Sequence, residues 1–155
     1  MIRFYLLAAY SSLLIVFSCC TTVDLYEKST AIPGHAWQNS FKPSFDFTIK
    51  DTTSLYQLFL VLRHTEKYRY TNIYINLYAQ VPGQDSAVKI QRDLLLATNE
   101  KGWLAAGMDD IYEHRIKLGE PEALKAGNYK FTVEQIMRDN PLQHVLDVGV
   151  RIEKK

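Results

Sequence analysis

Cysteine is nearly absent from this 155-residue sequence, which contains only Cys19 and Cys20. The body of the chain therefore has no disulfide to stabilise it and no thiolate for a structural zinc site. The four histidines form no closely spaced ligand pair, and neither a Gly-x-Ser-x-Gly elbow nor a glycine-rich phosphate loop occurs. These absences argue against an enzyme, a bound metal and a cofactor.

An excess of charge of one sign is also missing. The chain has 18 Lys+Arg and 17 Asp+Glu, and without the first 18 residues, which include Arg3, the balance is 17 to 17. A neutral domain has no general attraction for nucleic acid or anionic lipid, so nucleic acid is not an expected partner. Apolar residues make up 47% of the chain, which is too much for a disordered protein.

The only long hydrophobic run lies at the N-terminus. Met1-Ile2-Arg3 precedes an uncharged stretch from Phe4 to Phe17. As a helix this stretch spans about 21 Å, which is short of the roughly 30 Å hydrocarbon core of a bilayer. One positive charge before a short apolar run is typical of an export signal.

Val16-Phe17-Ser18-Cys19 resembles a lipobox, where bacterial lipoproteins are diacylated on cysteine and then cleaved. Residues 1–18 are therefore predicted to be a signal peptide, Cys19 the lipid attachment site, 19–38 a lipidated tether and 39–155 the folded domain. The alternative is an ordinary signal peptide with a chance cysteine. No Asp follows Cys19, which by analogy with bacterial sorting favours the outer membrane, with the domain facing the periplasm. The expected partner is then the lipid bilayer, through acylated Cys19.

The rest of the sequence alternates apolar and polar residues with a period of two. Such segments are 41–49, 68–81, 88–96, 129–133 and 146–152, whereas 55–64 is apolar almost throughout and is expected to be a central strand. The stretch 108–115 is expected to form a short helical turn. About seven strands at this spacing predict an all-β fold: a single antiparallel β-sandwich domain, either immunoglobulin-like or jelly-roll-like.

Two groups of residues are candidate contact sites. Tyr70, Tyr74 and Tyr78 are predicted to share one strand face and could form a platform for sugars or a partner protein, although half-buried tyrosines are common in strands. Arg138, Asp139 and Asn140 lie in a loop longer than a tight turn needs.

Asp109, Asp110, Glu113 and His114 form the only dense group of carboxylates and histidine. On a helical turn, Asp110 and His114 would share a face and could bind calcium or act as an acid–base pair. The simpler interpretation is a solvated loop with local ion pairs.

Several segments together resemble the GldH family of gliding-motility lipoproteins. They are Ile32-Pro33, Trp37, Asp51-Thr52-Thr53, Tyr70-Thr71-Asn72-Ile73, Gly107-Met108-Asp109-Asp110-Ile111-Tyr112, the run from Val133 to Leu142, and the run from Leu146 to Glu153. The resemblance covers nearly the whole chain and includes the lipobox. It departs from the family at Gln143-His144, where a Pro-Gly pair is expected.

This resemblance implies a non-enzymatic envelope lipoprotein that takes part in gliding and is associated with the type IX secretion machinery. The family offers no active site to transfer to this chain. Two rival hypotheses remain: a periplasmic glycan-binding lipoprotein that uses the tyrosine platform, and an enzyme built on Asp109, Asp110 and His114.

Overall fold

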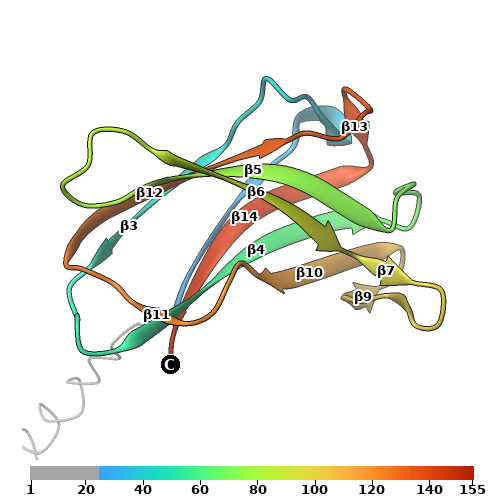
Figure 1. Cartoon of the computed structure of the whole chain (residues 1–155). Helices are drawn as coiled ribbons and strands as arrows, with labels where there is room; N and C mark the ends of the chain where they lie inside the picture. Colours follow the sequence, from blue (N-terminus) through green and yellow to red (C-terminus); the bar gives the residue numbers. More distant parts are fainter. Residues whose placement is uncertain (1–24) are drawn as a thin grey trace, which may run out of the picture.

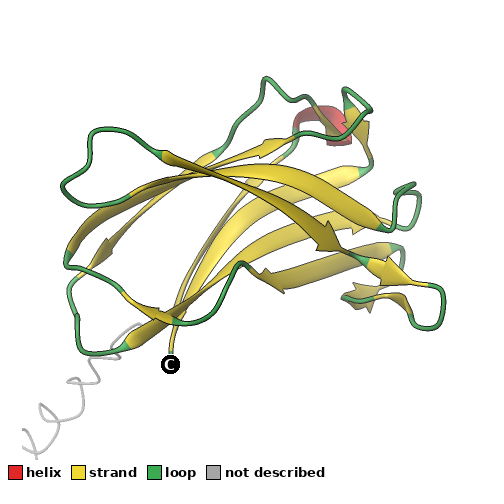
Figure 2. Ribbon diagram, in the orientation of Figure 1, coloured by secondary structure: helices red, strands yellow, loops and turns green. Residues whose placement is uncertain are grey.

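The computed structural model describes residues 25–155, which form two antiparallel β-sheets packed face to face (Figure 1). Between Leu25 and Lys155 the one helical element is the short 3-10 turn η1, Pro33–His35 (Figure 2). The predicted single-domain β-sandwich is confirmed. The signal peptide 1–18 and Cys19 lie outside the described residues.

The larger sheet has the strand order β1-β14-β4-β10-β9, with β11 also paired to β4. Its strands are β1 (Leu25–Ala31), β4 (Leu55–Thr65), β9 (Ala106–Met108), β10 (Ile111–Lys117), β11 (Glu122–Ala123) and β14 (Val145–Lys154). Leu60, Leu62, Val148 and Val150 of its two central strands are completely or almost completely buried.

The second sheet has the order β3-β12-β5-β6. It consists of β3 (Ser44–Ile49), β5 (Asn72–Gln80), β6 (Val88–Leu95) and β12 (Gly127–Gln135). Two short pairs complete the fold: β2 (Ala36–Trp37) with β13 (Leu142–Gln143), and β7 (Ala97–Thr98) with β8 (Gly102–Trp103).

The order of the eight main strands distinguishes the two predicted topologies. In chain order, the larger sheet contains the first, eighth, third and sixth strands, and the smaller sheet the second, seventh, fourth and fifth. The chain crosses between sheets at every step except the β5–β6 hairpin. This arrangement is a jelly roll rather than an immunoglobulin fold.

The aromatic side chains of β1, β3 and β12 join the two layers at one side. The Phe47 ring lies 5.6 Å from the Tyr26 ring and 5.1 Å from the Tyr129 ring, centroid to centroid. Alternate residues of β3 and β5, such as Phe45, Ile73 and Ile75, fill the interior. The period-two pattern of the sequence therefore identified the core correctly.

The predicted tether, residues 19–38, is wrong from Leu25 onward. β1 pairs with β14 along its whole length, from Leu25 opposite Glu153 to Ala31 opposite Asp147, and Trp37 is fully buried. β1 is an edge strand whose side chains are mostly exposed, so it lacks the apolar alternation that identifies a strand in sequence. The folded domain therefore includes residues 25–38, which precede the predicted start at residue 39.

The predicted helical turn over residues 108–115 is also wrong. Met108 ends β9 and Ile111 begins β10, and the two strands form a hairpin. Asp109 occupies the turn with a φ of 55°, a conformation that Asp tolerates better than most residues. Asp109 and Asp110 thus form the turn of a hairpin and are not part of a helix.

Candidate functional site

Two histidines from different strands meet inside the sandwich. His64 lies near the end of β4 and His114 lies in β10, where it is opposite Leu62 in the register of the two strands. Alternate residues of a strand face opposite sides, so both imidazoles point to the same side as Leu60 and Leu62, toward the core. Their exposed fractions are 0% and 1%.

The two rings are joined by a hydrogen bond between their Nε2 atoms, which are 2.9 Å apart. His64 Nδ1 lies 2.8 Å from the carbonyl oxygen of Thr65. A carbonyl can only accept, so His64 carries its proton on Nδ1 and its Nε2 accepts a hydrogen bond from His114 Nε2–H. In the neutral pair, His114 Nδ1 has no proton, and it is buried without a hydrogen-bond partner.

Three aromatic side chains surround the pair: Trp103 from β8, Tyr68 from the loop after β4, and Tyr112 from β10 itself. Measured from the His64 ring, the ring centroids of Trp103, Tyr68 and Tyr112 lie at 4.4, 5.0 and 5.8 Å. These three residues and the two histidines lie where β4 ends and β10 begins, and we call this the histidine end of the sandwich. Trp103 reaches it from β8, part of the short β7–β8 hairpin (Figure 1).

The environment of the pair favours uncharged imidazoles. Burial lowers the pKa of His64, although the Thr65 carbonyl opposes this shift. Burial and the neighbouring His64 ring lower the pKa of His114 to about 4, against the opposing effect of the Leu104 carbonyl. Both rings are therefore neutral at pH 7.

The pair has too few neighbours to hold a metal ion. Within residues 25–155, no group of three or more His, Cys, Asp or Glu side chains is arranged to bind one. Zinc and calcium need more protein ligands than two imidazoles supply.

The predicted acidic group around Asp110 and His114 is not assembled. Asp109 and Asp110 lie in the exposed β9–β10 turn, whereas His114 points into the core. Glu113 points to the outer face of the sheet, where its carboxylate lies 2.6 Å from the Arg115 guanidinium. The calcium site and the acid–base pair needed a helical turn; in the hairpin, Asp110 stays in the exposed turn and Glu113 faces away from the buried His114.

The predicted stripe of three tyrosines is not formed either. Tyr74 and Tyr78 lie on the outer face of β5, but Tyr70 precedes the strand, and its ring packs edge-on against Tyr68 at 6.0 Å. The Tyr78 hydroxyl donates to Glu134 at 2.6 Å. The continuous platform that a glycan-binding site would use is therefore absent among these three side chains.

Glu134 of β12 forms hydrogen bonds or an ion pair with three polar side chains. It accepts hydrogen bonds from Tyr78 and from Asn76, and it pairs with Lys42 at 2.7 Å. Burial alone would raise the pKa of Glu134, but these three donors outweigh it and lower the pKa to about 2. Tyr78 thus belongs to a closed polar network.

The loop that carries Arg138, Asp139 and Asn140 is held in place from inside. The buried amide of Gln135 donates to the carbonyls of Trp37 and Asp139, at 3.1 and 3.3 Å, and accepts from the amide of Met137. Asn140 exchanges two hydrogen bonds with Asn39, and Arg138 is exposed.

Tyr70 and Asp139 are the two predicted contact residues that the fold brings together. A hydrogen bond to the Asp139 carboxylate raises the pKa of Tyr70. Because Tyr70 packs on Tyr68, and Tyr68 on His64, ring contacts connect the loop to the buried pair. The loop is thus part of the histidine end.

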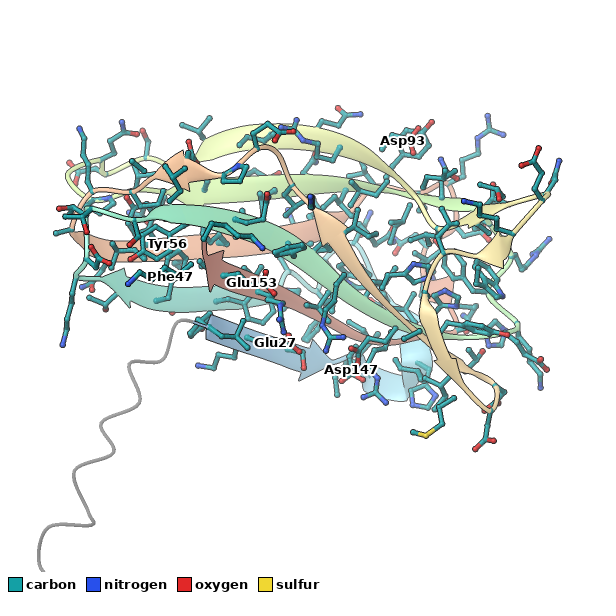
Figure 3. All side chains as sticks on the ribbon, turned by 90° about the horizontal axis from the view of Figure 1, so that it is seen from below. Glu27, Phe47, Tyr56, Asp93, Asp147 and Glu153 are labelled. Atoms are coloured by element: carbon teal, nitrogen blue, oxygen red, sulfur yellow. The ribbon has the colours of Figure 1, made fainter. Side chains whose placement is uncertain are left out.

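The opposite end of the sandwich is where β1 begins, and we call it the N-terminal end. Leu25, Tyr26, Phe47 and Tyr56 line a groove of about 600 Å³ there, and Figure 3 shows Phe47 and Tyr56 near the start of β1. β4 runs from this end to His64, and its 11 residues span about 35 Å. No helix between Leu25 and Lys155 has the length and hydrophobicity of a membrane span.

Comparisons with known proteins point to one family. The family model described as GldH lipoprotein matches residues 24–152. A gliding motility lipoprotein GldH homolog from Christiangramia forsetii is 29% identical over 150 residues, which cover 91% of this chain and 90% of the relative. The gliding motility lipoprotein GldH of Flavobacterium johnsoniae is 27% identical over 149 residues, covering 92% and 91%.

Among solved structures, one similar chain is a carbohydrate-binding module specific for non-crystalline cellulose. It has 14% sequence identity and a TM-score of 0.41, and the match covers 82% of this chain and 70% of the module.

Proposed function

Because the chain belongs to the GldH lipoprotein family, we propose that it is an outer-membrane lipoprotein that acts as a non-enzymatic structural or assembly component of the gliding and type IX secretion apparatus. Its lipid is carried by Cys19, and the domain faces the periplasm. Its partners are other proteins of that apparatus.

The short distance between lipid and fold supports this proposal most directly. Five residues, 20–24, lie between Cys19 and the first strand, and even a fully extended chain from Cys19 to Leu25 reaches only about 20 Å. The N-terminal end is therefore kept near the bilayer. The histidine end is directed away from it, where other envelope proteins are within reach.

The histidine end also has the features of a docking surface. Arg138 is exposed beside the ordered Tyr70–Asp139 contact, and Leu104 and Met108 are 41% and 79% exposed. Interfaces are enriched in Arg, Met and aromatic side chains, and a rigid loop lowers the entropic cost of binding. Anchoring on a surface raises the effective concentration of such a site for its partners.

Site-specific photocrosslinking in cells tests the orientation and the partner together. A photoreactive phenylalanine at Arg138 is expected to capture an envelope protein, whereas the same group at Lys50, near the N-terminal end, is not. Equal crosslinking from both positions, or none from Arg138, would contradict a docking role for the histidine end.

Lipidation is tested separately with Cys19→Ala. The wild-type protein is expected in the outer-membrane fraction with an acylated Cys19, and the variant is expected to lose the lipid and to impair secretion or gliding. An unacylated wild-type protein that still carries residues 1–18 would overturn the anchor.

A further inference from the structure

The buried histidine pair is a proton site that the proposed function does not use. We propose that His64 and His114 together bind a single proton, and that binding it opens the β7–β8 hairpin and so exposes the histidine end to water. The proton would act as the regulator of this end. The link to docking rests on the proposed function, but proton binding and hairpin opening do not.

The hydrogen-bond pattern fixes where the proton is accepted. His64 Nδ1 and His114 Nε2 already carry hydrogens, and His64 Nε2 is occupied as an acceptor. The remaining site is His114 Nδ1, which is buried and without a partner. The Leu104 carbonyl favours protonation of His114, but burial and the neighbouring His64 ring outweigh it and keep the pKa of His114 low in the closed form. A second proton would break the Nε2–Nε2 bond, so the pair takes one.

Among residues 25–155, no acidic side chain acts on the pKa of either histidine, so none compensates the added charge. The titratable groups in ring contact are Tyr68, from the loop after β4, and Tyr112, from β10, and phenols carry no charge in the acid range. Trp103 from β8 and Val145 from β14, which is opposite His64, do not titrate. The charged neighbours in sequence, Arg63, Glu113 and Arg115, lie on the other face of the sheet.

Ring contacts connect the pair to the acidic residue Asp139, which lies beyond the rings of Tyr68 and Tyr70. It contacts Tyr70, and it raises the pKa of Tyr68 together with burial and Tyr70. The cation would therefore be stabilised mainly by solvent and by the faces of the surrounding rings.

The β7–β8 hairpin is the segment that can admit solvent. Each of its strands has two residues, and residues 99–102 at its tip are exposed. Three backbone hydrogen bonds hold its base: Leu96 and Ala97 to the Thr71 carbonyl, and Leu104 to the Leu96 carbonyl. Short strands with few backbone bonds open at low free-energy cost.

The size of the effect follows from linkage. His114 has a pKa of about 4 in the closed form, and an exposed histidine has about 6.5. At pH 5 the open form is therefore favoured on the order of 20-fold more than at neutral pH. The window lies between about pH 6.5 and 4.

Fluorine NMR on the mature chain, which begins at residue 19 with Cys19→Ser and Cys20→Ser, tests the inference. The chain has two tryptophans, so 5-fluorotryptophan gives two resonances, and Trp103→Phe assigns them. Between pH 7 and 4 the Trp103 resonance is expected to move toward its solvent-exposed position, while that of the fully buried Trp37 stays fixed.

Two variants separate the pair from other acid effects. His64→Leu with His114→Leu is expected to abolish the movement of the Trp103 resonance, and His35→Asn, at an exposed histidine, is expected to leave it unchanged. A static Trp103 resonance in the wild type, or a shift that persists in the double variant, would overturn the inference. Because neither readout involves lipid or a partner, failure of the docking proposal leaves this result interpretable.

Discussion

On the two faces of strands β4 and β10, the ionisable side chains have opposite environments: they are paired with opposite charges on the outer face and are without a charged partner on the inner face. On the outer face, Arg63 and Arg115 pair with acidic neighbours, and Arg151 of β14 bridges Glu27 and Glu153. On the inner face of the same strands, His64 and His114 have only each other, two carbonyls and aromatic rings. Glu27, Asp147 and Glu153 are labelled along the outer face in Figure 3.

Because of this difference, the stability of one sheet depends on pH in two ranges, one set by the outer carboxylates and one by the inner imidazoles. Carboxylates that are paired with arginine stay charged until strongly acidic conditions, because their folded-state pKa values are lowered. Burial alone would raise the pKa of Glu27, but hydrogen bonds from Arg151 and Arg115 outweigh it and lower the pKa. Unpaired imidazoles resist charging and respond nearer to neutrality.

The largest expected effect comes from a substitution at Gly149, on the outer face of β14, that pushes β1 away from β14. A Cβ there would lie 2.5 Å from the Lys28 carbonyl oxygen and 2.9 Å from the Ser29 Cα, so β1 must move away from β14. We expect Gly149→Ala to lower the free energy of unfolding by about 3 kcal/mol, measured by urea denaturation. The His114 titration, followed by NMR, should be unchanged; a shift in that titration would mean that the two faces are coupled.

Removing half of the inner pair is expected to have the next largest effect. His64→Leu takes away the acceptor of His114 Nε2 and the donor to Thr65, leaving buried polar groups unpaired at a cost of about 2–3 kcal/mol. Adding His114→Leu removes the unpaired His114 Nε2–H group. The double variant should therefore lose less free energy of unfolding than the sum of the losses in the two single variants. Strict additivity in urea denaturation would show that the two imidazoles do not interact.

The pH dependence of stability should divide into two windows. Since the folded pKa of His114 lies below its unfolded value, the unfolded state binds the proton first, and stability falls as the pH drops from about 6.5 toward 4. The loss is about 2 kcal/mol at pH 5. Glu27 and Glu134 lose their contribution only as the pH falls below about 4.5.

In the His64→Leu/His114→Leu double variant, the upper window should disappear and the lower one remain. Thermal unfolding of both proteins from pH 7.5 to 3 measures the two windows. An upper window of equal size in the double variant would assign it to groups other than the pair.

The sequence predicted the sandwich and most of its core because apolar alternation records burial directly. The Tyr68–Val81 pattern placed Ile73, Ile75 and Leu77 inside, as they are. The same rule failed at β1, where an exposed edge strand is held by backbone bonds to β14 and its side chains carry no pattern. Edge pairing is a property of the partner strand and cannot be read from one segment.

The sequence did not predict the histidine pair, because it too depends on how two strands pair. His64 and His114 are 50 positions apart, and only the pairing of β4 with β10 makes them neighbours. One signal was present: both occupy positions that alternation assigns to the core, next to Leu62 and Ile116. A buried histidine needs a partner, and pairing the two inward histidines would have been a testable guess.

The smallest expected effect comes from neutralising one charge on the outer face. Glu27→Gln removes the carboxylate that Arg151 contacts at 2.6 Å and Arg115 at 3.4 Å, with a side chain that is 30% exposed. Partly exposed pairs contribute little, so we expect a loss of about 0.5 kcal/mol. Salt screens the remaining attraction, and the difference should shrink further in 0.5 M NaCl. An effect that matches His64→Leu, or that is independent of salt, would mean that the outer charges act as buried ones and that the two faces do not differ as described.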